Sequence, residues 1–156
     1  MAKAIREGSA IAISDGSFKG GFGTASWTIE DDEGGGLSGS VVCPGLSPDM
    51  SAYRNELAGL YSIAFITLQI CRFFKITEGA LTVGCDGLSA LREVFGSKAD
   101  IDAPSHDLIL ATRQIILTTP LKWLYTHVKG HQDDLGGELD RWASLNVLMD
   151  TRAKNH

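Results

Sequence analysis

The chain has 156 residues, of which 44% are hydrophobic, and it carries a formal net charge of −5. Its length fits one domain over residues 1–156 with a sizeable core, either standing alone or excised from a longer polyprotein. The acidic balance disfavours a protein that coats nucleic acid by bulk attraction, although it leaves room for an enzyme whose acids hold divalent cations. No apolar run approaches the roughly 20 residues of a membrane span, and residues 1–10 lack the apolar segment of a signal peptide. We therefore expect an intracellular protein, cytoplasmic or nuclear, without a membrane partner.

The first third of the sequence predicts three strands joined by turns. Residues 10–14, "AIAIS", form a short apolar run followed by Asp15 and Gly16, which is typical of a central strand that ends in a turn. The alternation over residues 22–30 indicates a second strand. A glycine-rich hairpin turn at 31–36 then leads into a third strand over residues 37–43. The chain is thus expected to open with an antiparallel meander.

The remaining segments predict strands that alternate with helices. After a connector at 44–51, helical spacing of apolar residues within 47–74 predicts a long helix with Ser51 as its N-cap. A strand at 80–86, a short helix at 87–95, a helix at 105–117 capped by Ser105, a strand at 120–128 and a helix at about 138–154 follow. Consecutive strands followed by alternating elements predict an α/β domain with a mixed sheet covered by helices.

Three cysteines, Cys43, Cys71 and Cys85, are widely spaced, and the sequence contains no CxxC pair. An odd number at such spacing favours free buried thiols over a disulfide or a metal role.

Four acids occupy the ends of different predicted elements. Asp15 and Asp86 follow the first and fourth strands, Glu56 lies in the first turns of the long helix, and Asp150 lies late in the last helix. Each acid alone has an ordinary explanation as a turn residue, a helix-face charge or half of an ion pair. Because ligands of such sheets sit beyond the strand ends, the four could instead converge at one edge. Clustered carboxylates are hard ligands suited to Mg²⁺ or Mn²⁺, and two such ions can clamp a phosphodiester.

The stretch "YTHVKGHQDDLGGELDR" adds two histidines. His127 falls in the predicted fifth strand and is interpreted as structural or solvated, whereas zinc would require further ligands that the sequence does not gather. His131 lies in a glycine-rich loop. Alone it is a solvated loop residue, but beside an acid cluster it becomes a candidate proton shuttle.

Five motifs, taken together, resemble those of a ribonuclease H domain, most of all the kind that accompanies the reverse transcriptases of retroelements. They are "ISDGS", "YRNELAGL", "TVGCDGLSAL", "HVKGHQDD" and "LNVLMDTRA", in the order of that family and spanning Ala10 to Ala153. The resemblance implies a five-stranded mixed sheet with strand order 3-2-1-4-5, flanked by helices.

The resemblance also implies an activity and a set of site residues. The family hydrolyses the RNA strand of RNA–DNA hybrids with two Mg²⁺ ions, which Mn²⁺ can replace, and leaves 5′-phosphate and 3′-hydroxyl ends. The matching metal ligands are Asp15, Glu56, Asp86 and Asp150, with Asp15 bridging both ions and His131 completing the catalytic set. The residues expected to touch the hybrid are Gly16, Ser17 and Asn55.

Some features depart from the family pattern or leave alternatives open. The stretch from Gly96 to Pro104 is short and acidic where some family members carry a basic hybrid-binding helix, so a neighbouring polymerase domain is expected to supply the grip. Asp140 competes with Asp150 as the fourth acid, and the "LN" before Asp150 and the small Ala153 after it favour Asp150. The alternative functions are a scaffold with lapsed catalysis and an integrase- or transposase-type nuclease.

Overall fold

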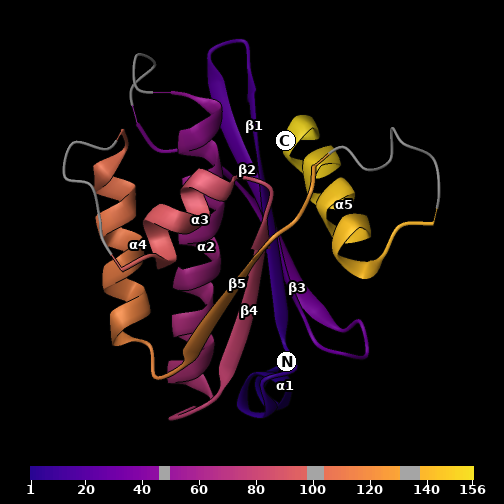
Figure 1. Ribbon diagram of the computed structural model, residues 1–156, viewed down its shortest axis with the longest axis vertical. Coiled ribbons are helices and arrows are strands. Elements are labelled where there is room, and N and C mark those ends of the chain that lie inside the picture. The colour runs from indigo at the N-terminus through magenta and orange to yellow at the C-terminus, as the bar shows by residue number, and fades with distance from the viewer. Residues whose placement is uncertain (46–49, 98–103, 131–137) are drawn as a thin grey trace.

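The computed structural model describes residues 1–45, 50–97, 104–130 and 138–156, which form a five-stranded sheet flanked by helices (Figure 1). The helices are α1 (Ala2–Glu7), α2 (Ala52–Phe73), α3 (Leu88–Phe95), α4 (His106–Thr118) and α5 (Arg141–Asn155). The strands are β1 (Ile11–Lys19), β2 (Phe22–Glu30), β3 (Gly36–Val42), β4 (Ala80–Cys85) and β5 (Lys122–His127).

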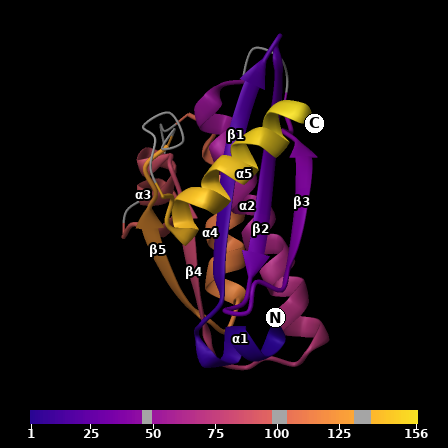
Figure 2. The same cartoon turned by 90° about the vertical axis from the view of Figure 1, so that its right-hand side faces the viewer.

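The sheet has the order β3-β2-β1-β4-β5. The first three strands pair antiparallel, whereas β4 runs parallel to both β1 and β5. This arrangement confirms the predicted mixed sheet and its strand order. Helices cover both faces: α2 packs on β1 and β2 with α4 against its outer side, and α5 crosses the opposite face of the same two strands (Figures 1 and 2).

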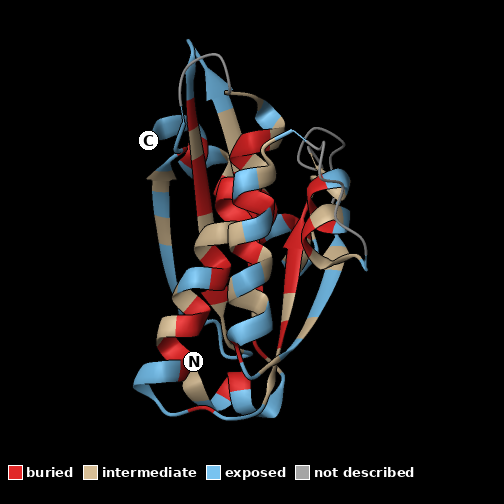
Figure 3. Ribbon diagram, turned by 90° about the vertical axis from the view of Figure 1, so that its left-hand side faces the viewer, coloured by how far each residue is buried: buried red, intermediate tan, exposed pale blue. Residues whose placement is uncertain are grey.

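The core lies mainly between α2 and the sheet, where the apolar stripe of the helix meets the central strands (Figure 3). A second, smaller cluster lies under α5 and joins Ile13, Val128, Leu145 and Met149. Because both faces of β1 are covered, Ala12 to Asp15 are all buried, including the polar Ser14 and Asp15. In α5, Met149 is fully buried, whereas its neighbour Leu148 is 40% exposed.

The first strand is longer than the sequence pattern predicts. It continues through Asp15 to Lys19, pairing with β2 up to Lys19↔Phe22, so the predicted turn at Asp15 and Gly16 is wrong. The turn is made instead by Gly20 and Gly21, whose φ angles of 61° and 84° favour glycine. The parallel pairing with β4 stops at Ile13↔Gly84, and therefore Asp15 lies just past the point where β1 outruns its neighbour.

The helix starts agree with the predictions only in part. The Ser51 side chain accepts a hydrogen bond from the Arg54 amide at 3.1 Å and caps α2 as expected. Ser105 occupies the N-cap position of α4 as predicted, with a left-handed φ of 64°, but its side chain makes no capping hydrogen bond. The short helix α1 has too few residues to show a periodic pattern and was not predicted.

Among the described residues, α2 alone is long and apolar enough to cross a membrane by length and composition. This corrects the expectation that no segment of the chain reaches that size. A core helix of a folded domain passes the same test, and α2 buries its apolar side chains against the sheet. The three cysteines are buried and free, as predicted.

Candidate active site

The structure brings the four predicted acids together at one edge of the sheet. Asp15 comes from β1, Glu56 from the second turn of α2, Asp86 from the residue after β4, and Asp150 from α5. They line one small pocket of about 80 Å³, together with Gly16, Asn146 and Val147. The parallel direction of β1 and β4 places Asp15 and Asp86 at the same edge, and the two covering helices bring in the other carboxylates from opposite faces.

The carboxyl groups in the pocket repel one another when ionised, and a bound cation would relieve this repulsion. Burial, and then the charges of Glu56, Asp86 and Asp150, raise the pKa of Asp15 from 3.8 to about 9. Burial and then the charge of Asp86 raise the pKa of Glu56 from 4.5 to about 8, although hydrogen bonds from Cys85 and Gly16 oppose this rise. Carboxyl groups this close cannot all ionise unless positive charge joins them.

Both oxygens of Glu56 are fixed by hydrogen bonds. The Gly16 amide donates to Oε1 at 3.0 Å and the Cys85 thiol donates to Oε2 at 3.0 Å. Gly16 is also a contact point between β1 and α2, since a Cβ atom there would lie 2.7 Å from the Glu56 backbone nitrogen. The absence of a side chain therefore lets α2 approach close enough to place Glu56 beside Asp15. Gly16 lines the pocket, and its contact with a hybrid stays a prediction.

The structure separates the two acids that competed for the fourth position. Asp140 is the N-cap of α5, and its Oδ1 accepts a hydrogen bond from the Ala143 amide at 2.8 Å. Asp150 lies three turns later and lines the pocket, where Lys154 Nζ contacts its Oδ2 at 2.6 Å. The acid that joins the cluster is therefore Asp150, and Asp140 has a local role in starting the helix.

Ser17 and Asn55, two of the residues predicted to contact a hybrid, lie in different surroundings. Ser17 is half-buried and lines a pocket separate from that of the four acids, so its contact with a hybrid stays a prediction. Asn55 is fully buried, and its Nδ2 donates to the Ser17 carbonyl oxygen at 2.7 Å. This placement does not fit a direct contact of Asn55 with a substrate, because its side chain ties α2 to the end of β1. The local sequence places Asn55 beside Glu56 but does not show which face of the helix it occupies.

Of the two histidines in this region, the structure describes only His127, which lies in the fifth strand as predicted. His127 ends β5 and is exposed, and its Nε2 lies 3.0 Å from the Asp86 backbone oxygen. His131 lies outside the described residues. Gly130, which precedes it, packs so closely on Asp86 that a Cβ atom there would lie 2.7 Å from Oδ2. The chain thus reaches the acid cluster one residue before His131.

Two residues of the site were not predicted from the sequence. Asn146 is 3% exposed and lines the pocket, and its Oδ1 has no hydrogen-bond partner among the described residues. Cys85 was predicted only as a free buried thiol, yet it contacts Glu56. The signal for Asn146 was its place one helical turn before Asp150, which puts both on one face of the helix. The sequence carries no comparable signal for Cys85.

The donor set fits divalent metal ions. Carboxylate oxygens of Glu56 and Asp86 and the sulfur of Cys85 lie within 4.8 Å of one another, and Asp15 and Asp150 supply further carboxylates to the same pocket. Carboxylate oxygens are the ligands that Mg²⁺ and Mn²⁺ prefer. The raised pKa of Asp15 gives the same indication from electrostatics.

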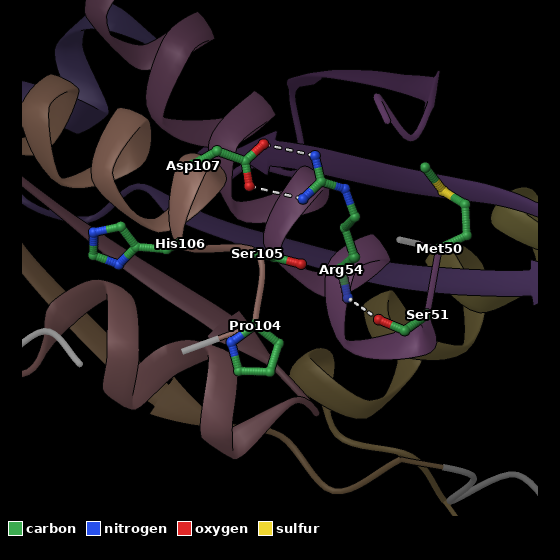
Figure 4. A pocket seen from close by; sticks show the side chains of 7 residues that line it. All are labelled: Met50, Ser51, Arg54, Pro104, Ser105, His106 and Asp107. Atoms are coloured by element: carbon green, nitrogen blue, oxygen red, sulfur yellow. Dashed lines mark hydrogen bonds and ion pairs between the residues drawn. The ribbon is translucent and has the colours of Figure 1, made fainter. Parts of the chain in front are cut away.

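A larger pocket of about 560 Å³ lies between the starts of α2 and α4 (Figure 4). Its lining includes Arg54, whose guanidinium makes two hydrogen bonds to Asp107 at 2.8 and 2.7 Å and a third to the Pro44 carbonyl oxygen. These bonds lower the pKa of Asp107. None of the four acids lines this pocket, so we interpret it as structural. The contacts of Arg54 with Asp107 and Pro44, which we call the joint between α2 and α4, hold the start of the helix that carries Glu56.

Comparisons with known proteins give a fold. No family model matches the sequence, and no curated protein matches it either. Three similar solved structures are ribonucleases H. The RNase H1 of Halobacterium salinarum NRC-1 has a TM-score of 0.56 at 15% identity, covering 88% of this chain and 92% of its own. The N-terminal RNase H domain of a Mycobacterium tuberculosis protein, solved as a fusion with maltose binding protein, has a TM-score of 0.53 at 14% identity, and the match covers 94% of this chain and 96% of that one. LC11-RNase H1, in complex with an RNA/DNA hybrid, has a TM-score of 0.57 at 14% identity, and the match covers 92% of this chain and 98% of that one.

These identities are too low to carry more than architecture. The chain therefore has the fold of the RNase H1 domains.

Proposed function

We propose that this chain is an endonuclease that hydrolyses the RNA strand of RNA–DNA hybrids with the help of two divalent metal ions. The observation that supports this most directly is the convergence of Asp15, Glu56, Asp86 and Asp150 in one pocket of an RNase H fold. Bound Mg²⁺ or Mn²⁺ would supply Lewis acidity and a nucleophile at neutral pH. The products expected are 5′-phosphate and 3′-hydroxyl ends.

The residues of the pocket have distinct tasks in this proposal. The charges of the other three acids all act on Asp15, which makes it the residue suited to bridge two ions. Glu56 and Asp86 lie together on one side and would complete one metal position, and Asp150 on α5 would complete the other. The Gly16 amide orients Glu56. His131 is proposed to move a proton at the leaving oxygen, since its neighbour Gly130 already lies against Asp86.

The substrate class is proposed from the fold and from the chemistry of hybrids. One of the similar structures is in complex with an RNA/DNA hybrid. Recognition of such a duplex relies on its shape and its 2′-hydroxyl groups, with little reading of bases. Gly16 lines the pocket and Ser17 follows it in β1, and these are the residues that we propose to contact the sugar-phosphate backbone.

We further propose that the domain serves the reverse transcriptase of a retroelement and works beside a polymerase domain. The support is the resemblance of "YRNELAGL" and its companion motifs, and the short stretch from Gly96 to Pro104, whose one basic residue is Lys98. A domain with a net charge of −5 has little general attraction for a duplex, so the isolated domain should bind hybrids weakly. Nanomolar affinity of the isolated domain at physiological salt, measured by fluorescence anisotropy, would contradict a need for a partner domain.

A panel of substrates tests the proposed activity. The wild-type protein is incubated with Mg²⁺ or Mn²⁺ and with an end-labelled RNA–DNA hybrid, single-stranded RNA, double-stranded RNA or duplex DNA of one sequence. We expect internal cuts in the RNA strand of the hybrid alone, and none in the presence of a chelator. Preferential cleavage of duplex DNA would indicate an integrase- or transposase-type nuclease instead. Failure to bind Mn²⁺ by calorimetry would indicate a scaffold.

A further inference from the structure

Cys85 occupies an unusual place for a cysteine that carries no disulfide. It is the last residue of β4, it is fully buried, and Asp86 follows it directly. Its Sγ lies 3.0 Å from Glu56 Oε2, which belongs to a helix 29 residues earlier in the chain. The thiol thus joins the two elements that carry Glu56 and Asp86.

The direction of the thiol proton follows from a second contact. The Gly87 amide donates a hydrogen bond to Cys85 Sγ at 3.3 Å, so the sulfur already accepts one proton from the backbone. A buried thiol at neutral pH keeps its own proton, because the ordinary pKa of a thiol lies above neutrality at roughly 8.5. In its ionised form, which is the form that binds a cation, the Glu56 carboxylate can only accept hydrogen bonds. The thiol proton therefore points to Glu56 Oε2.

The surroundings leave the Glu56 carboxylate little freedom. The Gly16 amide holds the other oxygen, Oε1, at 3.0 Å. A Cβ atom on Gly87 would lie 3.0 Å from Glu56 Cγ, so the turn after Asp86 packs closely on the same side chain. Among the described residues, only Gly16 and Cys85 donate hydrogen bonds to this carboxylate.

We propose that Cys85 is a positioning residue, whose thiol donates a hydrogen bond to Glu56 Oε2 and thereby fixes the direction in which Glu56 presents its carboxylate to a divalent cation. This inference rests on the proposed function, because it assigns a support for one of its metal ligands. Cys85 itself touches neither substrate nor cation. Its role is the outer support that metal-binding side chains receive from a second layer of residues.

The expected effect is moderate. Removing an outer hydrogen-bond partner of a metal ligand lowers metal affinity by about 10- to 100-fold, and a thiol is a weak donor. We expect Cys85→Ala to raise the Kd for Mn²⁺ by about tenfold, at the low end of that range. Cys85→Ser keeps a donor of nearly the same shape and should stay within about twofold of the wild type. Cys71→Ala, which removes another buried free thiol far along α2, is the matched control and should leave the Kd unchanged.

Calorimetry with Mn²⁺ alone, at a temperature well below unfolding of each variant, measures this comparison without any nucleic acid. A merely structural role would lower the melting temperature of both Cys85 variants and leave the Kd of both at the wild-type value. If Cys85→Ala does not fold, Cys85→Thr, which keeps a hydrogen-bond donor, is compared with Cys85→Val, which has a similar shape and no donor. Equal Kd values for Mn²⁺ in the variant with a donor and the variant without one would overturn the proposal.

Infrared spectroscopy tests the hydrogen bond itself in the absence of metal. With Cys43 and Cys71 replaced by alanine, one thiol remains, and its S–H stretching band should lie at lower frequency than that of a free thiol. Glu56→Ala should move the band back up. A band at the free-thiol frequency before that substitution would contradict the proposal.

These measurements distinguish a failure of the proposed role of Cys85 from a failure of the proposed ribonuclease activity. A wild-type protein that shows the shifted band and the Kd differences but cuts no hybrid would retain the role of Cys85 as a support of Glu56 and refute the proposed activity. A protein that cuts hybrids while Cys85→Ala binds Mn²⁺ like the wild type would refute the positioning role and leave the activity standing.

Discussion

At the scale of single residues, a bound cation or a rise in pH would shift Asp15 from its neutral to its ionised form. Asp15 is 4% exposed and faces three other carboxylates, so burial and repulsion together favour its neutral form. Bringing these acids together without metal therefore costs folding free energy. Titratable groups with strongly shifted pKa values that are clustered in this way are typical of functional sites.

The raised pKa of Asp15 predicts how metal-free stability depends on pH. A carboxyl whose pKa is about 9 in the folded protein and near 3.8 when unfolded contributes stability below pH 3.8, and this contribution is lost as pH rises towards 9. Asp31 and Asp107 have lowered pKa values, so their contributions are complete above about pH 5 and do not interfere there. We expect the free energy of unfolding in a chelator to fall between pH 5 and pH 9.

Chemical denaturation at a series of pH values measures this slope, and two controls accompany it. Asp15→Asn removes one of the two carboxyl groups with a strongly raised pKa and should make the slope shallower, with the contribution of Glu56 remaining, while Mn²⁺ should restore stability most at the alkaline end because it binds the ionised carboxylates. A wild-type curve that stays flat or rises over this range in the chelator would contradict the electrostatic account of the pocket.

At the scale of elements, helix α5 carries two acids with different tasks. Asp140 satisfies the backbone at the first turn, and Asp150 faces the pocket from the third. The sequence alone places both on one helix and leaves the choice open, because the helix start depends on a cap that is recognised only once the chain has turned. The structure resolves the choice through the contacts of the two side chains.

Substituting the two acids should separate stability from activity. Asp140→Ala removes the cap and should lower the free energy of unfolding by about 1 kcal/mol, with cleavage of the hybrid retained. Asp150→Asn should reduce cleavage by on the order of a hundredfold or more, because a ligand of one cation is lost. It should not lower stability, since relief of repulsion with Asp15 offsets the loss of an exposed ion pair to Lys154. If Asp140→Ala abolished cleavage while Asp150→Asn left it unchanged, Asp140 and not Asp150 would be the fourth acid of the site.

The joint between α2 and α4 depends on the buried, positively charged side chain of Arg54. The Arg54 side chain is 7% exposed, and it bridges the Pro44 carbonyl oxygen and the carboxylate of Asp107. Arg54→Met keeps the packing of the aliphatic stem and removes these bonds, so we expect a loss of about 1–3 kcal/mol in the free energy of unfolding. Lys3→Met, which breaks the exposed pair with Glu7, is the control and should change it by less than about 0.5 kcal/mol. Equal effects in thermal or urea denaturation would show that the joint contributes little.

At the scale of the whole molecule, the topology explains how distant segments form one site. Strands β1 and β4 run in the same direction, so Asp15 within β1 and Asp86 after β4 lie near each other, and helices α2 and α5 cover opposite faces of the sheet (Figure 1). These two helices contribute Glu56 and Asp150 to the same pocket. The order of the elements after α1 followed from periodic patterns, which are local properties of the sequence. The strand order and the assignment of the four acids followed from the resemblance of the motifs to those of a ribonuclease H domain.

The features that sequence reasoning missed depend on contacts between segments. The extension of β1 beyond Asp15 is set by its register with β2, the burial of Asn55 by the approach of α2 to β1, and the contact of Cys85 with Glu56 by the meeting of β4 and α2. No local pattern records such contacts. The same reason left Asn146 unassigned, since an asparagine on a helix has many ordinary explanations.

The most direct test of the central claim is cleavage of an end-labelled RNA–DNA hybrid by the wild type, Asp15→Asn and Asp86→Asn, at equal concentration and with saturating Mg²⁺ or Mn²⁺. The account predicts metal-dependent cuts in the RNA strand by the wild type, and a loss of on the order of a thousandfold in both variants because each substitution removes a ligand of the two-cation site. Circular dichroism of each variant confirms that it is folded. Full activity in either folded variant would contradict the assignment of this pocket as the catalytic centre.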